Sequence, residues 1–318
     1  MAGLVVILLG AEMLLRGASR IAVMLGIRPI VIGLTVVTVG TTMPELAVGV
    51  TSALEGKGSL AVGNIAGTNI MNILFILGLS ALIRPLPMRL LSIQLDVPVM
   101  IASSLALIAM AWDGVLSRTE GSLLLLGAAA YTVAMVPLNR RETRALKREF
   151  AEEYNAAALG TRRSAPHATW NTLLLLVGIA LTVLGARLLV SSAVNIAQAW
   201  GVSDAIIGLT IVAIGTSAPE LATTVMATLR NDRDVAVGNL IGSCIYNVLV
   251  ILGITCMVAP DGVAIGRDIL LIDLPLAAAA AVLCWPVFRT DRLVSRLEGG
   301  SFVCAYLAYL GWLVFVRS

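Results

Sequence analysis

The sequence predicts an all-α integral membrane protein with ten transmembrane helices in two inverted five-helix repeats. Three observations support this fold class: the composition, an internal duplication and the distribution of basic residues in loops. Of 318 residues, 58% are hydrophobic and only 13% are charged, whereas a soluble domain averages about 25% charged residues. The net charge of +3 provides no case for nucleic-acid binding.

Ten apolar segments are long enough to cross about 30 Å of hydrocarbon. They must be helical in lipid, because no water is present there to satisfy the backbone. The expected spans fall near residues 3–25, 29–54, 60–83, 92–112, 119–138, 169–195, 204–229, 235–258, 268–288 and 298–316. The polar segment 139–168, with a helix expected around 142–158, is interpreted as a linker between a first repeat (1–138) and a second (169–318).

The duplication is clearest in residues 33–80 and 208–255, which match in a single register without a gap. These stretches begin GLTVVTVGTTMPEL and GLTIVAIGTSAPEL. Each copy places one carboxylate, Glu45 or Glu220, inside an otherwise apolar span. A duplicated hydrophobic unit with one buried acid per copy predicts a symmetric membrane protein with an ion site between its halves.

Basic residues in the loops predict the orientation of the chain. Seventeen Lys and Arg residues lie in loops on the side of the linker and four on the opposite side, with Arg187 ambiguous within a span. The linker is therefore expected to be cytoplasmic, with both termini outside. Because five spans is an odd number, the second copy enters the membrane inverted relative to the first. The symmetry axis would bring the two matched motifs together at the bilayer centre.

The first motif is a Gly-Thr-[Thr/Ser]-x-Pro-Glu segment at 40–45 and again at 215–220. Proline removes a backbone donor and clashes with the carbonyl four residues earlier, so carbonyls near 38–41 and 213–216 are expected to leave the helical ladder. The motif also supplies side-chain oxygens from Thr41, Thr42, Glu45, Thr216, Ser217 and Glu220. An all-oxygen cage of this kind favours hard cations such as Ca²⁺ and Na⁺. The alternative is a proline-kinked helix with a protonated, hydrogen-bonded glutamate.

The second motif places polar residues one helical turn apart in segments 63–72 and 238–247. Residues four apart share a helix face, which groups Thr68 with Asn72 and Ser243 with Asn247. These four are candidate neutral ligands. Asn64 and Asn239 lie one turn earlier, as further ligands or as braces for the broken helices. Gly-xxx-Gly spacing in both segments also permits close helix packing.

The two motifs together resemble the α-repeats of the cation/Ca²⁺ exchanger superfamily, in its prokaryotic sodium/calcium exchanger branch. The resemblance covers nearly the whole chain. It implies alternating access around a central Ca²⁺ site with flanking Na⁺ sites, formed by broken helices 2, 3, 7 and 8. It implies that Glu45 and Glu220 bind both ions and that Thr41 and Thr216 offer carbonyls to Ca²⁺. It assigns the Na⁺ sites to Thr42, Thr68, Asn72, Ser217, Ser243 and Asn247, with the carbonyls of Thr38 and Ala213.

Some positions depart from the family pattern. Some members carry Asp at the position of Asn247, a feature associated with potassium coupling, so Asn here argues against that coupling. The Gly-Asn-Ala-x-Glu signature of proton-coupled calcium exchangers is absent from both copies. Thr38 occupies a position that is usually small, and we expect it to crowd one Na⁺ site.

The sequence therefore predicts a sodium/calcium antiporter of the plasma (inner) membrane that exchanges several Na⁺ for one Ca²⁺. The family resemblance implies that glycine-rich spans one and six slide across the remaining core to switch access. We expect no enzymatic activity and no cofactor, membrane lipid as the surroundings, and a functional monomer. An H⁺/Ca²⁺ exchanger using the same glutamates and a passive cation channel remain alternatives.

Several residues are expected to have structural roles only. Asp96 and Asp273, each followed by an x-Pro pair, are predicted to cap the starts of their helices. Glu12 and Arg187 occupy equivalent positions in spans one and six and are expected to pack or form an ion pair at the rim. Four cysteines in apolar runs are expected to be packing residues: Cys244, Cys256, Cys284 and Cys304.

Overall fold

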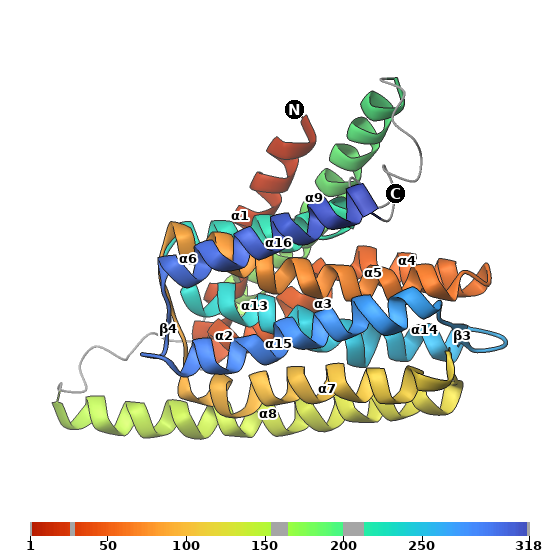
Figure 1. The fold of residues 1–318 in the computed structure, drawn as a ribbon. Helices are drawn as coiled ribbons and strands as arrows, with labels where there is room; N and C mark the ends of the chain where they lie inside the picture. The colour runs from red at the N-terminus through yellow and green to blue at the C-terminus, as the bar shows by residue number, and fades with distance from the viewer. Residues whose placement is uncertain (1, 26–28, 154–164, 200–212, 317–318) are drawn as a thin grey trace.

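The computed structural model describes residues 2–25, 29–153, 165–199 and 213–316, and most of them are helical (Figure 1). Six of the helices outside predicted spans two, three, seven and eight are long: α1 (Ala2–Leu25), α7 (Val97–Met110), α8 (Arg118–Glu153), α9 (Ala165–Ala199), α15 (Leu274–Arg289) and α16 (Arg296–Val316). Helix α8 runs without a break from predicted span five into the helix expected in the linker. The first part of predicted span seven, 204–212, lies outside the described residues.

Predicted span two is a broken helix. It comprises α2 (Pro29–Ile32), the π-helical η1 (Gly33–Val37), α3 (Thr38–Thr41) and α4 (Met43–Leu54). The break falls at Thr42, where the helix axis bends by 46°. In the second copy, α11 (Ala213–Thr216) and α12 (Ala218–Leu229) flank Ser217. The backbone angles at the two breaks agree, with φ −84° and ψ 9° at Thr42 and φ −85° and ψ 6° at Ser217. The proline of each motif follows in the first turn of the new helix, which explains the shared position of the break.

Predicted spans three and eight also match. The first consists of α5 (Gly58–Ile70), η2 (Met71–Leu77) and α6 (Gly78–Ile83), and the second of α13 (Arg233–Tyr246), η7 (Asn247–Leu252) and α14 (Gly253–Val258). Both η2 and η7 are π-helical, a conformation frequent at functional sites. These spans are continuous helices with a π-helical middle, so the expectation that they are broken helices is wrong for both.

Two short antiparallel ladders join loops of the first copy to loops of the second. Strand β1 (Leu86–Pro87) pairs with β4 (Leu293–Val294), and β2 (Val115–Leu116) pairs with β3 (Val263–Ala264). The labels β4 and β3 lie at opposite ends of the bundle in Figure 1. We call these the β4 end and the β3 end. The ladders therefore connect the two copies at both ends.

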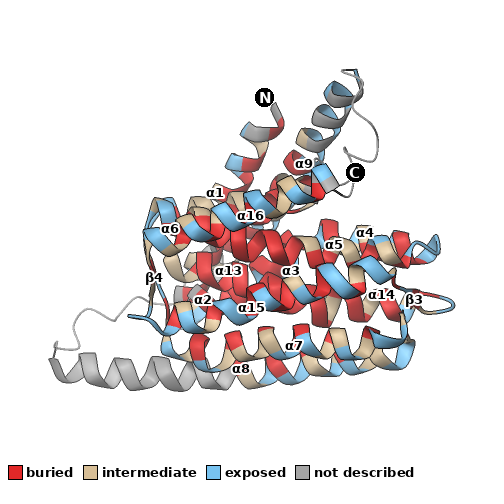
Figure 2. Ribbon diagram, in the orientation of Figure 1, coloured by how far each residue is buried: buried red, intermediate tan, exposed pale blue. Residues whose placement is uncertain are grey.

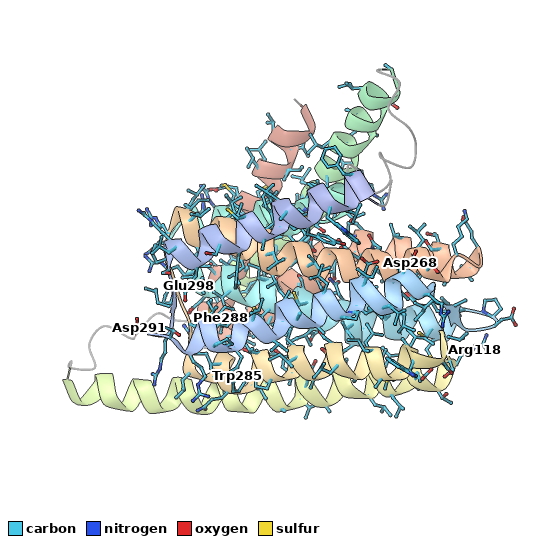
Figure 3. All side chains as sticks on the ribbon, viewed as in Figure 1. Arg118, Asp268, Trp285, Phe288, Asp291 and Glu298 are labelled. Atoms are coloured by element: carbon cyan, nitrogen blue, oxygen red, sulfur yellow. The ribbon has the colours of Figure 1, made fainter. Side chains whose placement is uncertain are left out.

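Five described helices are long and apolar enough to cross a membrane: Gly58–Ile83, Ser92–Asp113, Ala168–Leu189, Arg233–Val258 and Ile269–Arg289. The bent pair around Thr42 raises the number to six. Figure 3 shows labelled charged residues at the bundle ends, with Arg118 and Asp268 at one end and Asp291 and Glu298 at the other. This arrangement fits a membrane protein, while the count of ten spans stays a prediction.

Helices α1 and α9 pack with their backbones in close contact. A Cβ atom added at Gly10 would lie 2.5 Å from the Thr182 nitrogen, and one at Gly185 would lie 2.6 Å from the Ile7 nitrogen. Such distances are impossible for real side chains, so glycine is required at this crossing. In Figure 1 the two helices are steeply inclined to α7, α8 and α15. They therefore form a distinct pair against the rest of the bundle.

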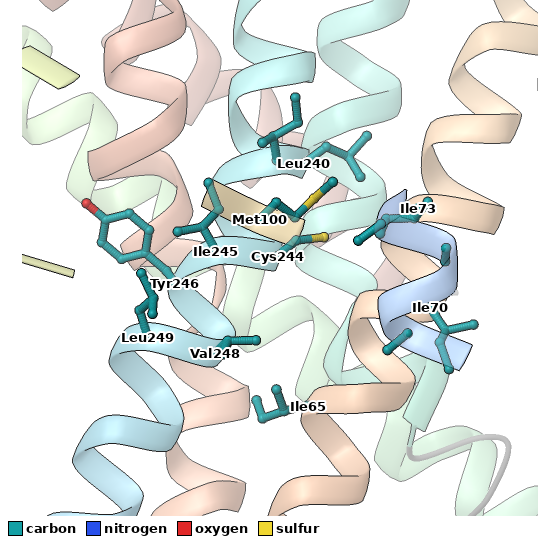
Figure 4. Packing of buried hydrophobic residues seen from close by; sticks show 14 of the residues in the cluster. Ile65, Ile70, Ile73, Met100, Leu240, Cys244, Ile245, Tyr246, Val248 and Leu249 are labelled. Carbon is teal, nitrogen blue, oxygen red and sulfur yellow. The ribbon is translucent and has the colours of Figure 1, made fainter. Parts of the chain in front are cut away.

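Buried residues gather in the middle of the bundle, around α3 and α13 (Figure 2). Figure 4 shows part of this core, where Met100 and Cys244 lie beside Leu240 and Ile245. Cys244, Cys256 and Cys284 are buried free thiols, as expected for packing residues, whereas Cys304 is exposed.

The prediction that Asp96 and Asp273 cap helix starts is wrong. Each lies at the end of a π-helical segment, η3 (Ser92–Asp96) or η8 (Ile269–Asp273), which continues directly into α7 or α15, and neither makes a side-chain capping bond. Their carboxylates instead accept hydrogen bonds from the hydroxyls of Tyr131 at 2.9 Å and Tyr309 at 3.4 Å. Each helix thus begins before its aspartate, at Ser92 or Ile269.

Candidate cation site

The two motif glutamates lie inside the bundle, where Glu45 is 0% and Glu220 is 1% exposed. Each sits in the first turn of a helix, α4 or α12, where the positive end of the helix dipole favours a carboxylate. The two carboxyl groups are close enough to interact electrostatically. None of their four oxygens has a hydrogen-bond partner among the described residues. Two buried acids that interact and lack partners are expected either to protonate or to bind a cation.

Neutral side chains of the second motif add further unpaired oxygens. They are Asn72 Oδ1, Asn247 Oδ1 and Ser243 Oγ, on residues that are 0% exposed. With the carboxylates this makes seven buried oxygens without a hydrogen-bond partner in the described part of the chain. Native proteins leave few buried polar groups unpaired, and such a group calls for an explanation such as a bound ion.

The hydroxyls of the first motif form hydrogen bonds either to the other copy or within their own helix. Thr41 Oγ1 donates to Asn239 Oδ1 at 3.3 Å, and Ser217 Oγ donates to Thr68 Oγ1 at 3.3 Å. Thr42 Oγ1 instead donates to the Thr38 carbonyl at 2.9 Å. Thr216 is half-buried at the end of α11, and Ala213 begins that helix. The structure thus brings parts of both first motifs to the same region.

The expectation that the Thr38 carbonyl leaves the helical ladder is wrong. It accepts the Thr42 N–H at 3.0 Å as well as the Thr42 hydroxyl. The proline at position 44 affects the carbonyl four residues earlier, at Gly40, and not that of Thr38. A role for the Thr38 carbonyl toward Na⁺ therefore requires it to share its lone pairs with these donors.

The side chain of Thr38 is directed toward α13. Its hydroxyl donates to the Gly33 carbonyl at 2.7 Å and lies 3.4 Å from the Asn239 carbonyl. A Cβ at Gly242 would meet this hydroxyl at 2.5 Å. The absence of a side chain at Gly242 thus makes room for the bulk of Thr38.

Asn239 and Asn64 occupy matched positions but different surroundings. The Asn239 amide donates to Thr223 Oγ1 at 3.0 Å and to Thr224 Oγ1 at 3.1 Å, while its oxygen accepts from Thr41. The amide nitrogen of Asn64 is buried without a hydrogen-bond partner among the described residues. In the first copy, Val48 and Gly49 stand where the second has the two threonines. Asn239 therefore has the contacts of a brace, and Asn64 does not.

The sequence analysis missed Asn69. Its oxygen accepts the Asn247 amide at 2.9 Å, and its own amide donates to the Cys244 carbonyl at 3.1 Å. Asn69 thereby fixes the amide of Asn247 and leaves the oxygen of Asn247 unpaired. The matched residue in the second copy is Cys244, so Asn69 does not stand out in a comparison of repeats. The missed threonines Thr223 and Thr224 could have been found as hydroxyls present in one copy only.

The donor set fits hard cations. No group of three or more His, Cys, Asp or Glu side chains arranged to hold a metal occurs in the described residues. The charge of the site therefore comes from two carboxylates, and the other donors are amide and hydroxyl oxygens. Ca²⁺ and Na⁺ prefer this chemistry.

Comparison with known proteins assigns the chain to a class and a family. A family model described as sodium/calcium exchanger protein matches residues 1–136 and 170–315. The relative CaxA of Alkalimonas amylolytica is 38% identical over 313 residues, covering 96% of this chain and 95% of the relative. The inner membrane protein YrbG of Escherichia coli is 36% identical over 317 residues, covering 98% and 95%.

Solved structures of the sodium-calcium exchanger NCX_Mj have the same fold. One of them, soaked without Na⁺ and Ca²⁺, superimposes with a TM-score of 0.81 at 26% identity, covering 98% of this chain and 96% of that chain. The protein is thus an integral membrane transporter of the exchanger class, not an enzyme. It belongs to the sodium/calcium exchanger family, in agreement with the resemblance found in its motifs.

Proposed function

We propose that the protein is a sodium/calcium antiporter that exchanges several Na⁺ for one Ca²⁺ by alternating access. The observation that carries this proposal is the set of seven unpaired, buried oxygens, four of which belong to two interacting carboxylates. Two carboxylates balance the charge of one Ca²⁺, and the flanking amide and hydroxyl oxygens suit Na⁺. Because both ions need the same carboxylates, they compete, and this competition couples their movements.

Each candidate ligand has a proposed role. Glu45 and Glu220 bind both ions, with carbonyls of Thr41 and Thr216 completing the Ca²⁺ site. The Na⁺ sites use Thr42, Thr68, Asn72, Ser217, Ser243 and Asn247, with the carbonyls of Thr38 and Ala213. Asn69 orients Asn247, and Asn239 braces the broken helix of the first copy through Thr41. Asn64 stays a candidate ligand through its side-chain oxygen, as its position in the second motif predicts.

We further propose the complete arrangement of ten spans in two inverted repeats, 1–138 and 169–318, joined by a cytoplasmic linker at 139–168. The agreement of the helix breaks at the matched positions Thr42 and Ser217 supports the repeat. Ladders at opposite ends support its inversion: β1 in the loop after α6 matches β3 in the loop after α14, yet they lie at opposite ends. The name of the YrbG relative supports an inner-membrane location. The protein would act as a monomer surrounded by lipid, with both termini outside.

The runner-up function is H⁺/Ca²⁺ exchange through protonation of the same glutamates. The unpaired carboxylates are compatible with either coupling ion. The neutral oxygens of Asn72, Ser243 and Asn247 favour Na⁺, because a proton needs only the carboxylates, whereas Na⁺ needs several further ligands.

The test is Ca²⁺ uptake into proteoliposomes under a Na⁺ gradient alone and under a pH gradient alone. We expect uptake driven by Na⁺, and a loss of at least about a hundredfold in Glu45→Gln and in Glu220→Gln, because a single charge cannot balance Ca²⁺. Asp261→Asn, which removes an exposed loop carboxylate, is the matched control and should keep full activity. Uptake driven only by a pH gradient, or persisting without any counter-ion, would favour the H⁺ exchanger or a channel instead.

A further inference from the structure

The turns that follow α4 and α12 have the same backbone but opposite charges. The residues are Glu55-Gly56-Lys57 in the first copy and Arg230-Asn231-Asp232 in the second. Gly56 and Asn231 both have positive φ, 71° and 66°. The Lys57 N–H binds the Ser52 carbonyl at 2.7 Å, and the Asp232 N–H binds the matched Ala227 carbonyl at 2.9 Å. The two turns are therefore equivalent in structure, and their reversed charges need a separate cause.

These two turns lie at opposite ends of the molecule. The turn at Arg230 lies at the β4 end, where Arg84 donates to Asn231 and Arg89 forms an ion pair with Asp234. The turn at Glu55 is followed by Ser59, whose hydroxyl accepts the Gly266 N–H at 2.8 Å just after β3. Each turn thus marks one end of the bundle.

The helix pair α1 and α9 carries the complementary charges at matched positions. Glu12 of α1 corresponds to Arg187 of α9 in the register of the two copies, just as Glu55 corresponds to Arg230. In the structure Glu12 forms an ion pair with Arg230, and it also binds Arg16 at 2.6 Å. Ser19 of the same helix donates to Asp232 Oδ2 at 3.1 Å. The pair of helices is therefore attached to the turn at the β4 end.

The equivalent contact at the β3 end is absent. Arg187 is exposed and has no ion-pair partner among the described residues, and Glu55 binds Lys57 at 2.7 Å instead. The hydrogen bond from Lys57 lowers the pKa of the Glu55 carboxyl, which keeps it charged at neutral pH. A carboxylate at the C-terminal end of α4 is disfavoured by the helix dipole, so stabilising that helix does not explain its presence.

We propose that Glu12–Arg230 at the β4 end and Arg187–Glu55 at the β3 end are alternating latches, of which each holds one of the two access states. The proposal rests on the alternating access of the proposed function. When α1 and α9 shift toward the β3 end as one body, the first ion pair breaks and the second forms. The reversed charges of the two turns then have a function. Glu12 meets the basic Arg230 in one state, and Arg187 meets the acidic Glu55 in the other, so each pairs with an opposite charge.

The strength of the latches suits a transporter that must cycle. Glu12 is 20% and Arg230 is 32% exposed at the side chain, and partly exposed ion pairs stabilise only weakly. Two weak latches of similar strength leave both states populated, whereas one strong latch would trap a single state.

Cysteine cross-linking tests the alternation directly. In a variant whose four native cysteines are replaced and whose transport is retained, Glu12→Cys is combined with Arg230→Cys, and Arg187→Cys with Glu55→Cys. A short bifunctional methanethiosulfonate reagent spans an ion-pair distance. We expect both pairs to cross-link and each cross-link to block exchange until a reductant is added. Glu12→Cys with Glu55→Cys, whose positions lie at opposite ends, is the matched control and should not cross-link.

Charge reversal supplies a second readout. Glu12→Arg alone and Arg230→Glu alone should slow exchange about fivefold or more, and the double variant should recover most of it. The same holds for Arg187→Glu and Glu55→Arg. Failure of the Arg187–Glu55 pair to cross-link in a protein that exchanges ions normally would overturn the latches. Cross-linking of both pairs in a protein without Na⁺-driven Ca²⁺ flux would support the latches and overturn the proposed function.

Discussion

The two symmetry-related sides of the cation site differ in how many of their polar groups are already paired. On the paired side, Asn239 is bonded by both ends of its amide, Asn247 is held by Asn69, and Thr68 meets Ser217. On the unpaired side are the matched residues Asn64, Asn72 and Ser243, which retain buried polar atoms without partners among the described residues. Asparagine occupies both matched positions 64/239 and both matched positions 72/247, so the identity of these side chains does not cause the difference.

The difference comes from the residues around these asparagines. Thr223 and Thr224 in the second copy replace Val48 and Gly49 of the first, and Asn69 in the first replaces Cys244 of the second. Each replacement supplies a hydrogen-bonding partner to one side only. The protein therefore holds the paired side in place, whereas under the proposed function the unpaired side would gain its partners from bound ions. The two sides of the proposed site thus differ in how firmly the protein holds their side chains.

The largest effect is expected from Asn72→Leu on the unpaired side. The change removes a proposed ligand, and we expect Na⁺-driven Ca²⁺ flux to fall at least about tenfold, which corresponds to about 1.4 kcal/mol. Because the Asn72 amide has no partner among the described residues, its loss should also stabilise the ion-free protein by about 1–3 kcal/mol. Flux in proteoliposomes and thermal unfolding in detergent without ions measure the two effects. Unchanged flux would remove Asn72 from the site.

The next effect concerns Asn69→Ala on the paired side. This change leaves the Asn247 amide without its acceptor, so we expect a flux reduction of about fivefold, mainly through weaker apparent Na⁺ affinity. In contrast to Asn72→Leu, the variant should be less stable without ions. Asn69→Gln, which keeps the amide, is the comparison that separates hydrogen bonding from packing. Equal behaviour of Asn69→Ala and wild type in Na⁺ titrations would contradict the positioning role.

A smaller effect is expected from removing the brace of Asn239. Thr223→Val and Thr224→Val each delete one hydroxyl that accepts from Asn239, at a cost of about 1 kcal/mol in stability. Flux should change by about twofold or less in either single variant, because one acceptor remains. The double variant should lose more than the sum of the singles, since the buried amide is then unpaired. Thermal unfolding of the three variants provides the comparison.

The smallest effect is expected from Val48→Thr, which gives the first copy one of the hydroxyls found in the second. We expect Asn64 to gain an acceptor and stability to rise by about 0.5–1 kcal/mol. The matched change at Gly49 is not available, because a Cβ there would lie 2.7 Å from the Thr255 hydroxyl. A destabilised Val48→Thr variant would show that the difference between the two sides does not depend on these neighbours.

Sequence reasoning located the helix break of the first copy and the buried acids because glycine, proline and glutamate rarely occur together inside an apolar span unless the helix is interrupted there. The ungapped register of the two copies also predicted the matching break at Ser217. The carbonyl of Thr38 was predicted wrongly, because proline acts on Gly40 and threonine hydroxyls bind back to their own helix. Asp96 and Asp273 were mistaken for caps because sequence shows an Asp-x-Pro pattern but not the tyrosine that approaches from another helix.

Asn69 could not be found by comparing the repeats. Its role depends on facing Asn247 from the other copy, a contact between residues 178 apart in sequence. An asymmetric residue within a symmetric motif looks like a tolerated difference until the structure shows its partner.

The two small ladders have a consequence for how the protein is made. Leu86 pairs with Val294, about 200 residues later in the chain, and at a synthesis rate of about 5–20 residues per second this partner emerges about 10–40 s afterwards. During this time the loop strands of the first copy are unpaired, and its Glu45 lacks the matching Glu220. Truncation of the chain before β4 should therefore leave β1 without its partner and give a less stable protein than the full chain.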